Sequence, residues 1–542
     1  MWLYLSAVLY RFFVLFVVLW SMPISWADTV ASAPLRFLPV LDAGRVKPYD
    51  TFSKEVLQLI YGKTTYEGKP AYQIVTTWWL QPDLWKDKAI FEIKPFELKN
   101  TLGLPPQDRY FTLEQLIAHP RLPDLFQQLQ EMREKKMKLD PFFQSVQRLE
   151  QQLFVYRELV SGNLVNVLPV SDSQWKNLNQ LNDEERSDFL KITDLFIQSL
   201  TSPNSLEIRD QLERAIQQFR SRGIQVDDQK IKAEVHYGDF HPFRWAAIFY
   251  VLASLVMGLI WILKKNRLEY GIWIFALVGL ILHIYGFGLR VYLSGRAPVT
   301  NMYETVVWVA LGAVVFGMIL EGIYRWRFIL GTGTVVGAFC LILSDLAPAV
   351  LDPSIQPLEP VLRSNFWLIV HVTTIVISYA AFFLSFALGN LGLFWYLRDE
   401  KGYQERINAI TLACYRSIQI GVSFLAPGII LGGVWADYSW GRFWDWDPKE
   451  TWSLIALLGY LAILHARLVG WLKSFGLLAS SVFAFNLIIM AWYGVNFVLG
   501  AGLHTYGFGA GGIEYVSAFV FLHLGYVIYA LLVYRSRSRV SS

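Results

Sequence analysis

The chain has 542 residues, of which 54% are hydrophobic and 17% are charged, and its formal net charge is +4. Soluble proteins average about 25% charged residues, so this composition excludes an ordinary soluble protein and indicates a membrane protein with several spans. The small net charge does not indicate nucleic-acid binding, and the two distant cysteines, Cys340 and Cys414, exclude a disulfide framework and a CxxC redox site.

Residues 1–27 are predicted to form a signal peptide or an N-terminal anchor. The apolar run "FFVLFVVLW" (12–20) is followed by the small residues Ser25 and Ala27, which permit cleavage after Ala27. An uncleaved anchor is the alternative. Both interpretations place residue 28 and the residues after it outside the cytoplasm.

The next segment, 28–242, is polar and long enough for one exported domain. Its runs at 144–160 and 205–222 have the spacing of apolar residues that is typical of helices. We therefore expect this domain to be mainly helical.

From residue 243 onward, hydrophobic runs alternate with short polar loops. Each run is near or above the roughly 20 residues that a helix needs to cross the hydrocarbon core. The predicted spans are 243–263, 271–293, 303–321, 328–346, 366–397, 417–436, 452–471, 477–499 and 515–534. The predicted fold class is therefore a polytopic all-α membrane protein, with about nine transmembrane helices over 243–535 after the exported domain.

The loops expected on the cytoplasmic side are rich in basic residues, as the positive-inside rule requires when the exported domain lies outside. These basic residues are Lys264, Lys265, Arg267, Arg325, Arg327, Arg398, Lys401, Arg406, Arg416, Lys473, Arg535, Arg537 and Arg539. The main exception is the outer loop "RVYLSGRAPVTNMYE", which holds Arg290 and Arg296. This topology places residues 440–454 outside, between the sixth and seventh spans.

The stretch "WGRFWDWDPKETWSL" (440–454) contains a helix start. Asp447 can cap free N–H groups, Pro448 fits the first helical position, and Glu450 completes a capping box. This structural role accounts for Asp447 without any catalytic function.

Tryptophans are unusually dense before that helix start. Such residues collect at membrane interfaces because their rings are apolar with one polar edge. That tendency does not explain why Trp440, Trp444 and Trp446 crowd ahead of the cap. We interpret the rings as a platform for a large flat ligand.

Two histidines lie near the level of the tryptophan-rich stretch. His371 is about five residues inside the fifth span, and His504 lies in the outer loop "GAGLHTYGFGAGG". Two neutral imidazoles can supply the two axial bonds of a haem iron. The alternative is that His371 is a hydrogen-bonded interface residue and that His504 belongs to a glycine-rich turn. Haem propionates would meet Arg442, Lys449, Arg290 or Arg296, among which the sequence does not choose.

Further histidines lie within the membrane, where ionisable residues are costly and tend to be functional. His283 is in the second span and His465 is in the seventh, toward the cytoplasm. They could form a second, inner pair of haem ligands. His523 is a reserve candidate whose alternative role is packing. His119, His236 and His241 are assigned no role.

These residues together resemble the tryptophan-rich haem-handling family of cytochrome c assembly proteins, of the CcsA/ResC type (System II), over about 245–535. The stretch 440–454, within a loop at 435–453, resembles the family's WWD signature. "HVTTIVISYAAF", "YLAILHARL" and "GLHTYG" resemble its histidine-bearing segments in order, and "GRAPVTNMYE" resembles its long forms. The polar domain, with "GRVKPYDT", is similar in part to the exported, CcsB-like region of fused CcsBA-like proteins.

The resemblance implies a role in cytochrome c assembly in a bacterial inner membrane. Haem b, preferably ferrous, would be carried to the periplasmic face and presented there to the CxxCH motif of apocytochrome c. Thioether bonds would form in a cytochrome c synthetase (haem lyase) complex that includes this chain. The implied partners are haem, apocytochrome c, thiol-reducing proteins and a separate CcsB-like membrane subunit, with no nucleic acid.

By position, the resemblance assigns His371 and His504 to an external haem iron and His465 to an internal one. The candidate haem-binding residues are His371, His504, His465, His283, Trp440, Trp444, Trp446, Asp447 and Arg442, and none is assigned as catalytic. One departure from the family pattern is the lack of a multi-span CcsB unit before the exported domain. A separate CcsB-like chain, which we favour, or His283 would then supply the second internal ligand.

Two other function classes compete with cytochrome c assembly. One is a b-type membrane electron-transfer cytochrome. Such proteins typically carry two histidines on one helix, and no predicted span here carries two, which is evidence against this class. The other is a transporter with an aromatic gate, which would need no haem.

Overall fold

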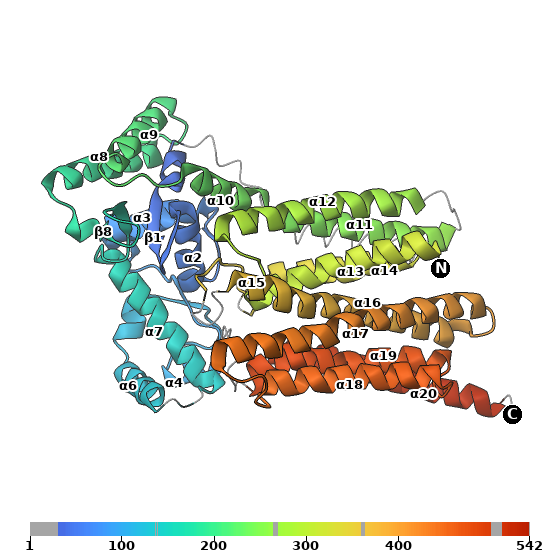
Figure 1. Cartoon of the computed structure of the whole chain (residues 1–542). Coiled ribbons are helices and arrows are strands. Elements are labelled where there is room, and N and C mark those ends of the chain that lie inside the picture. The colour runs from blue at the N-terminus through green and yellow to red at the C-terminus, as the bar shows by residue number, and fades with distance from the viewer. Residues whose placement is uncertain are drawn as a thin grey trace. The chain divides into compact units, whose positions relative to one another are not determined.

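The chain divides into two units, Met1–His241 and Pro242–Ser542 (Figure 1). The computed structural model describes residues 31–135, 137, 139–263, 269–348, 350–358, 364–499 and 512–540. The predicted signal segment 1–27, the basic residues Lys264, Lys265 and Arg267, and His504 lie outside the described residues.

The N-terminal unit is mainly helical, as expected. Its α-helices are α2 (Tyr49–Tyr61), α3 (Ala71–Leu80), α4 (Phe96–Thr101), α5 (Leu113–Ile117), α6 (Arg121–Glu134), α7 (Pro141–Val160), α8 (Asp183–Thr201), α9 (Leu206–Arg220) and α10 (Asp228–Phe240). The short helices η2 (Ala33–Phe37), η3 (Pro82–Trp85) and η4 (Leu178–Gln180) are 3₁₀ turns.

The same unit contains short strands that the sequence did not indicate. They are β1 (Pro39–Asp42), β2 (Arg45–Pro48), β3 (Thr65–Tyr66), β4 (Lys69–Pro70), β5 (Phe91–Glu92), β6 (Tyr110–Phe111), β7 (Asn166–Pro169) and β8 (Trp175–Asn177). An antiparallel sheet has the strand order β2-β1-β7-β8, with Leu41 opposite Val46 and Asn166. Strands this short carry too few residues for period-two alternation to be visible in the sequence.

The segment "GRVKPYDT" (44–51) forms the end of the β1–β2 turn, strand β2 and the start of α2, and its charged residues are paired within the N-terminal unit. Asp50 contacts Arg36 at 3.0 Å and Lys54 at 2.7 Å. Burial alone would raise the pKa of Asp50, but the charges of Lys54 and Arg36 outweigh burial and lower that pKa. Similar pairs are Arg45–Glu234, Lys47–Asp42 and Lys47–Glu55. These residues therefore stabilise the hairpin against α2 and α10.

The second unit consists of long helices. They are α11 (Pro242–Leu263), α12 (Glu269–Ser294), α13 (Met302–Tyr324), α14 (Ile329–Leu346), α15 (Asn365–Trp367), α16 (Thr373–Asp399), α17 (Gln404–Trp440), α18 (Pro448–Leu468), α19 (Ser474–Ile489) and α20 (Ile513–Val540). Two π-helical segments, η7 (Leu368–Val372) and η8 (Met490–Leu499), lead into α16 and extend α19.

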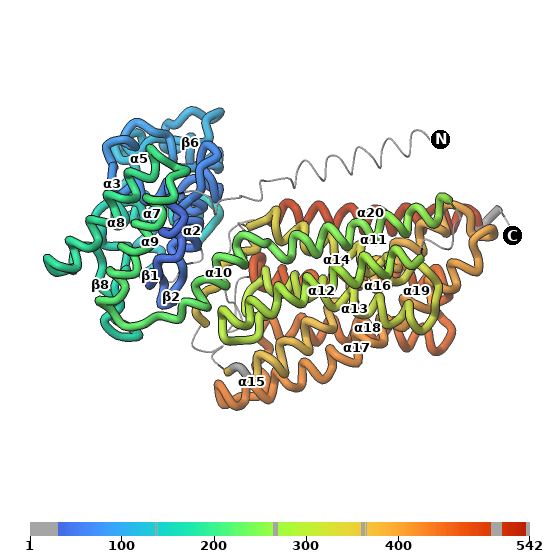
Figure 2. Tube along the Cα trace, turned by 90° about the horizontal axis from the view of Figure 1, so that it is seen from above, coloured from blue at the N-terminus to red at the C-terminus, as the bar shows by residue number. Residues whose placement is uncertain are grey.

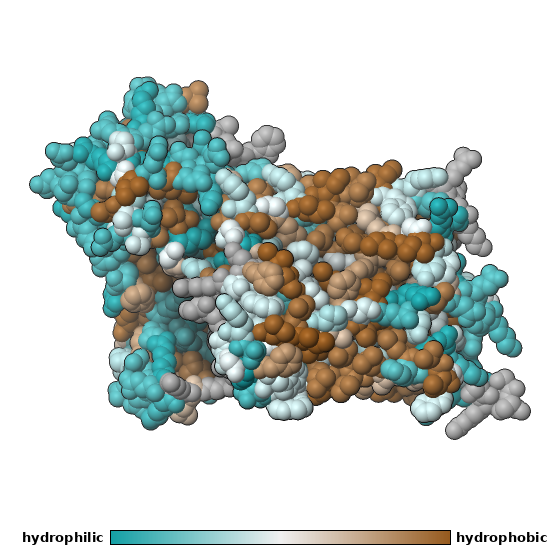
Figure 3. All heavy atoms as spheres, in the orientation of Figure 1, coloured by the Kyte–Doolittle hydropathy of each residue, from teal (hydrophilic) through white to brown (hydrophobic). Residues whose placement is uncertain are grey.

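The prediction of nine membrane spans is confirmed. Within the described residues, nine helices are long and apolar enough to cross a membrane. They run side by side as one bundle (Figure 2), and its visible outer surface is mostly hydrophobic (Figure 3). Helix α17 extends well before the predicted span 417–436, because its first turns are too polar to register as hydrophobic.

Helix α16 organises the part of the bundle that holds the candidate site. It packs against α13, α14, α17, α19 and α20. Glycines allow close approach: a Cβ on Gly389 would lie 2.9 Å from the carbonyl oxygen of Leu478 on α19. Helix α16 is thereby held between α17 and α19, and its preceding segment η7 lies against α17.

Candidate functional site

A cavity of about 180 Å³ lies where η7, α13, α16, α17, α18 and η8 meet. Its aromatic lining is Trp435, Trp444, Trp492 and Tyr379, and its polar lining includes Thr300, Asn301, His371, Lys449, Glu450 and Asn496. All of these residues belong to the second unit. The structure thus brings one predicted histidine, one predicted tryptophan and Lys449 together.

The imidazole of His371 is held in a defined orientation. Its Nδ1 lies 2.8 Å from the carbonyl oxygen of Gly428 on α17, which can only accept a hydrogen bond. Nδ1 must therefore carry the proton, and Nε2 is the basic nitrogen when the ring is neutral. A metal-binding histidine commonly has this arrangement, because a bond at one nitrogen fixes the tautomer and raises the basicity of the other.

Local backbone features let His371 approach α17 so closely. A Cβ on Gly432 would lie 2.5 Å from His371 Cε1, so only glycine leaves room for the ring. Pro427 stands inside α17, where its missing N–H removes one helical hydrogen bond next to Gly428. Trp435, three residues after Gly432, meets the imidazole edge-on with ring centroids 5.7 Å apart.

Both π-helical segments contribute to the cavity lining. Leu368, His371 and Val372 come from η7, while Trp492 and Asn496 come from η8. π-Helical turns are rare and occur frequently at functional sites. The presence of two π-helical segments at one cavity supports a functional role for that cavity. No simple sequence pattern predicts such turns.

The predicted helix start in the tryptophan-rich stretch is confirmed. Asp447 caps α18, accepting hydrogen bonds from the backbone N–H groups of Lys449 (2.8 Å) and Glu450 (3.2 Å), with Pro448 in the first turn. The Glu450 carboxylate accepts a hydrogen bond in return from the Asp447 N–H, which completes the capping box. Asp447 is therefore engaged in structure and is buried.

The tryptophans of the stretch take different positions. Trp444 lines the cavity and meets Trp446 edge-on, but the Trp446 side chain is 69% exposed. Trp440 lies under the guanidinium of Arg442, which is 5.4 Å from the ring centroid. Trp435 and Trp492 complete the cavity wall, and neither was among the residues predicted from the sequence to contact the ligand.

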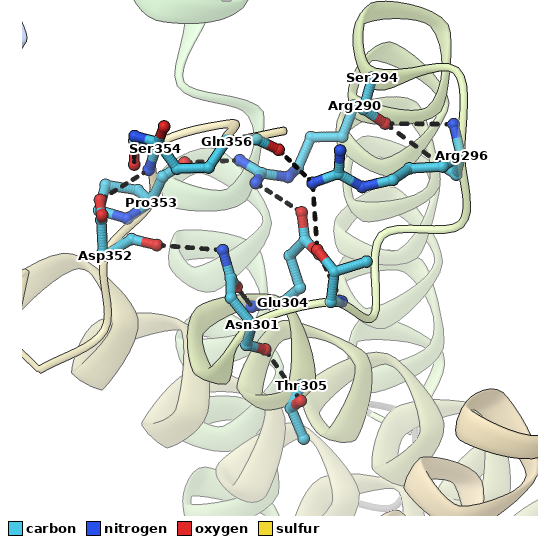
Figure 4. Close-up of polar contacts among 11 residues, drawn as sticks. Arg290, Ser294, Arg296, Asn301, Glu304, Thr305, Asp352, Pro353, Ser354 and Gln356 are labelled. Carbon is cyan, nitrogen blue, oxygen red and sulfur yellow. Dashed lines mark hydrogen bonds and ion pairs between the residues drawn. The ribbon is translucent and has the colours of Figure 1, made fainter. Parts of the chain in front are cut away.

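Two arginines considered for propionate binding are engaged in a polar network at the start of α13 (Figure 4). Arg290 Nη2 contacts Glu304 Oε1 at 2.7 Å, and both side chains are 1% exposed. Arg290 Nη1 donates to the carbonyl oxygen of Pro353, and Arg296 Nη2 donates to Thr300 Oγ1 and the carbonyl oxygen of Gln356. These side chains therefore join α12, α13 and the segment 352–356.

The other two cations lie at the tryptophan-rich stretch and differ in their partners. Arg442 contacts Asp445 at 3.5 Å and Glu450 at 3.3 Å. Lys449 lines the cavity, and its Nζ lies 3.4 Å from Asn496 Oδ1. Among the described residues, no carboxylate oxygen lies within 4.0 Å of Lys449 Nζ.

Among the described residues, the other histidine candidates, His283, His465 and His523, do not line this cavity. His283 is fully buried among Phe243, Tyr250 and Phe287, with Tyr250 Oη 3.2 Å from its Nδ1. His465 is exposed and lies roughly 25 Å along α18 from Pro448, at about 1.5 Å per residue.

Backbone bonds also set the tautomers of two of these histidines. His465 Nδ1 lies 2.7 Å from the carbonyl oxygen of Leu461, and His523 Nδ1 lies 2.8 Å from that of Phe519. His283 and His465 are on helices with different main packing neighbours: α12 packs on α11, α13 and α14, and α18 packs on α17, α19 and η8. The inner pair of ligands therefore stays a prediction.

Replacing Gly432 by alanine is expected to displace the imidazole of His371, because the new methyl group would lie 2.5 Å from Cε1. The sequence resemblance implies that His371 binds haem iron, and on that assignment we expect haem affinity to fall about 10- to 100-fold, the usual effect of losing a supporting contact at a metal ligand. The measurement is a haem titration of the purified chain followed by visible absorbance. Gly288→Ala is the control, since a Cβ there would meet nothing within 4 Å; equal affinities in the two variants would contradict the expectation.

Comparison with known proteins gives a consistent family. Residues 299–504 match the family model described as "Cytochrome C assembly protein". The chain is 30% identical to protein NrfI of Wolinella succinogenes over 502 residues, covering 86% of this chain and 53% of that protein. It is 35% identical to the cytochrome c biogenesis protein CcsA of Chlorella vulgaris over 253 residues, covering 40% of this chain and 79% of that protein.

Coverage differs among the relatives. The chain spans about half the length of NrfI and 62% of the length of CcsA from Chlamydomonas reinhardtii, to which it is 34% identical. A solved structure of the cytochrome c haem lyase CcmF aligns with a TM-score of 0.39 and 16% identity, covering 53% of this chain and 50% of that one. A similarity at that level adds nothing to the family relationship seen in sequence.

Proposed function

Since this chain belongs to the CcsA-type cytochrome c biogenesis proteins, we propose that it takes part in cytochrome c assembly, where it carries haem across the membrane and presents it for attachment to apocytochrome c. The proposed location is a bacterial inner membrane, with the N-terminal unit and the tryptophan-rich stretch on the periplasmic side. Haem is here a substrate that passes through the protein.

The observation that carries this proposal is the imidazole of His371 at the tryptophan-lined cavity. Its Nδ1 is bonded to the Gly428 carbonyl oxygen, so Nε2 is the nitrogen suited to bind iron. Trp435, Trp444 and Trp492 give the cavity the flat apolar walls that suit a macrocycle. We propose His504 as the second axial ligand, on the sequence resemblance.

The size of the cavity requires one further step. At about 180 Å³ it is smaller than the roughly 300–1,000 Å³ of typical ligand sites. A second, apolar cavity of about 340 Å³ shares Thr305, Tyr379 and Trp492 with it. Trp492 lines both spaces, and we propose that a movement of its side chain joins them when haem enters.

An internal haem site is proposed around His465. The bond from Nδ1 to Leu461 leaves Nε2 as the ligating nitrogen there too. His283 is enclosed by aromatic rings and has no solvent exposure. That enclosure supports a ligand from a separate CcsB-like subunit in preference to His283.

Covalent attachment would proceed by addition of each cysteine S–H of the CxxCH motif across a haem vinyl group. The sulfur bonds to a vinyl carbon and the proton goes to the other carbon, so no group leaves. The chain contributes orientation and proximity of vinyl and thiol. Its own thiols, Cys340 and Cys414, are buried, so the reacting thiols belong to the apocytochrome and are kept reduced by partner proteins.

Two measurements test the proposed function. The purified chain should show a haem Soret band, whose absence would favour a transporter that needs no haem. Co-expression with an apocytochrome c and the partner subunit should give covalently attached haem, seen as stain that survives denaturing electrophoresis. A Soret band without any covalent product would instead indicate a b-type electron-transfer cytochrome.

A further inference from the structure

Of the four cations near the tryptophan-rich stretch and the outer loop before α13, Lys449 has a distinct environment. Arg290 contacts Glu304, and Arg442 contacts Asp445 and Glu450. Arg296 donates to Thr300 Oγ1 and to a backbone carbonyl oxygen of the segment 352–356. Lys449 is half-buried and lines the cavity with only an amide oxygen, Asn496 Oδ1, as a described polar contact of its ammonium group.

A cation in such a place costs free energy unless an anion or several oxygen atoms compensate for lost hydration. Glu450 is the only carboxylate among the described residues that line the cavity, and both of its oxygen atoms are bonded to groups other than the Lys449 ammonium. Its Oε1 contacts Arg442, and its Oε2 accepts the backbone N–H groups of Asp445 and Asp447. The charge of Asp447 also acts on Lys449, but its carboxylate caps the backbone N–H groups of Lys449 and Glu450. Since no described carboxylate oxygen lies within 4.0 Å of Lys449 Nζ, the ammonium group can still pair with an anionic group brought by a ligand.

Two further donors belong to the same cavity lining. The indole Nε1 atoms of Trp444 and Trp492 are buried and have no hydrogen-bond partner among the described residues. Buried donors are normally paired, so each such atom calls for an explanation. The ammonium group of Lys449 and the two indole N–H groups can all donate hydrogen bonds to a carboxylate.

We propose that Lys449, with the indole N–H groups of Trp444 and Trp492, binds a carboxylate of the ligand held against His371. This rests on the proposed function, under which that carboxylate is a haem propionate. Lys449 thus orients the macrocycle by one edge while the imidazole binds iron. Arg290 and Arg296 do not bind the carboxylate in this proposal; they hold Glu304 and Thr300 at the start of α13 in place.

The test compares haem with its dimethyl ester, in which both propionates are neutral, by titrating the full-length purified chain and following the Soret band. The wild-type chain should bind haem more tightly than the ester. Lys449→Met should weaken haem binding about 10- to 100-fold, as expected for loss of a charge-assisted hydrogen bond. Binding of the ester should change little, so the preference for haem is lost.

Matched variants separate ligand binding from folding. Lys449→Arg keeps the charge and should keep most of the preference, while Lys473→Met, the same change at an exposed lysine, should keep all of it. Trp444→Phe and Trp492→Phe should each reduce the preference about 2- to 10-fold. Trp395→Phe should not, because its unpaired Nε1 lies outside the cavity, where the ring packs on Tyr403.

The outcomes are distinguishable. A wild-type chain that binds neither compound would contradict the proposed function itself. A wild-type chain that binds both equally, or a Lys449→Met variant that loses both equally, would overturn the carboxylate assignment while leaving haem binding intact.

Discussion

Replacing His371 by alanine is expected to reduce the yield of cytochrome c with covalently attached haem by about 100-fold or more. This loss is larger than the roughly 10- to 100-fold effect of removing a residue that only supports a metal ligand. The physical reason is that the variant lacks the nitrogen Nε2 that would bind iron. It also lacks the Nδ1–H group that donates a hydrogen bond to the Gly428 carbonyl oxygen. His504→Ala is expected to have the same effect, from the sequence resemblance. The measurement is haem-stained holocytochrome after co-expression, normalised to the amount of this chain in the membrane.

Rescue distinguishes loss of a ligand from loss of the fold. Added imidazole should restore part of the yield by filling the vacated axial position. His119→Ala, in the N-terminal unit, is the control and should leave the yield unchanged. Wild-type yields from both the His371 and His504 variants would remove the assignment of the external ligands.

Replacing Glu304 by glutamine is expected to lower the free energy of unfolding by about 3–5 kcal/mol, because it removes one partner of a buried ion pair and leaves the other charge in place. Glu304 contacts Arg290 at 2.7 Å and accepts two hydrogen bonds from Thr300. A drop of several degrees in the thermal unfolding midpoint of the detergent-solubilised chain would show this loss. The first turn of α13 lines the cavity, so haem affinity should fall as well.

A double variant tests the cause of that destabilisation. Arg290→Met with Glu304→Leu removes both charges, and such replacements are often neutral or stabilising. The more exposed pair Arg244–Asp345, between α11 and α14, is the control, and Asp345→Asn should cost about 1 kcal/mol or less. If Glu304→Gln and Asp345→Asn shifted the midpoint equally, burial would not be the source of the effect.

Much of the membrane unit follows from local sequence signals. Nine spans and the helix start at Asp447–Pro448 are confirmed, because hydropathy over about 20 residues and capping chemistry depend on neighbouring residues only. The strands of the N-terminal unit were missed, since β1 and β2 have four residues each. Helix α17 was predicted too short, because its polar beginning is helical for reasons other than hydrophobicity.

The cavity was only partly predictable. Trp440, Trp444 and Trp446 were expected to form a platform of rings, and of these only Trp444 lines the cavity, together with Trp435 and Trp492. The glycine-rich run "PGIILGGVW" (427–435) was a usable signal, since small residues at helix spacing permit a neighbouring ring to approach. Nothing comparable in the sequence indicates that Trp492 lies in a π-helical segment.

By itself, the sequence determined a chain of membrane spans, the capped start of α18 and the family to which the protein belongs, because each of these depends on residues close together along the chain. Only the tertiary structure decided which side chains meet. His371, Trp435, Lys449 and Trp492 come from four different helical segments, and Arg290 finds Glu304 on another helix. The direction of a side chain around its helix, and the packing of that helix on its neighbours, are properties of the whole bundle.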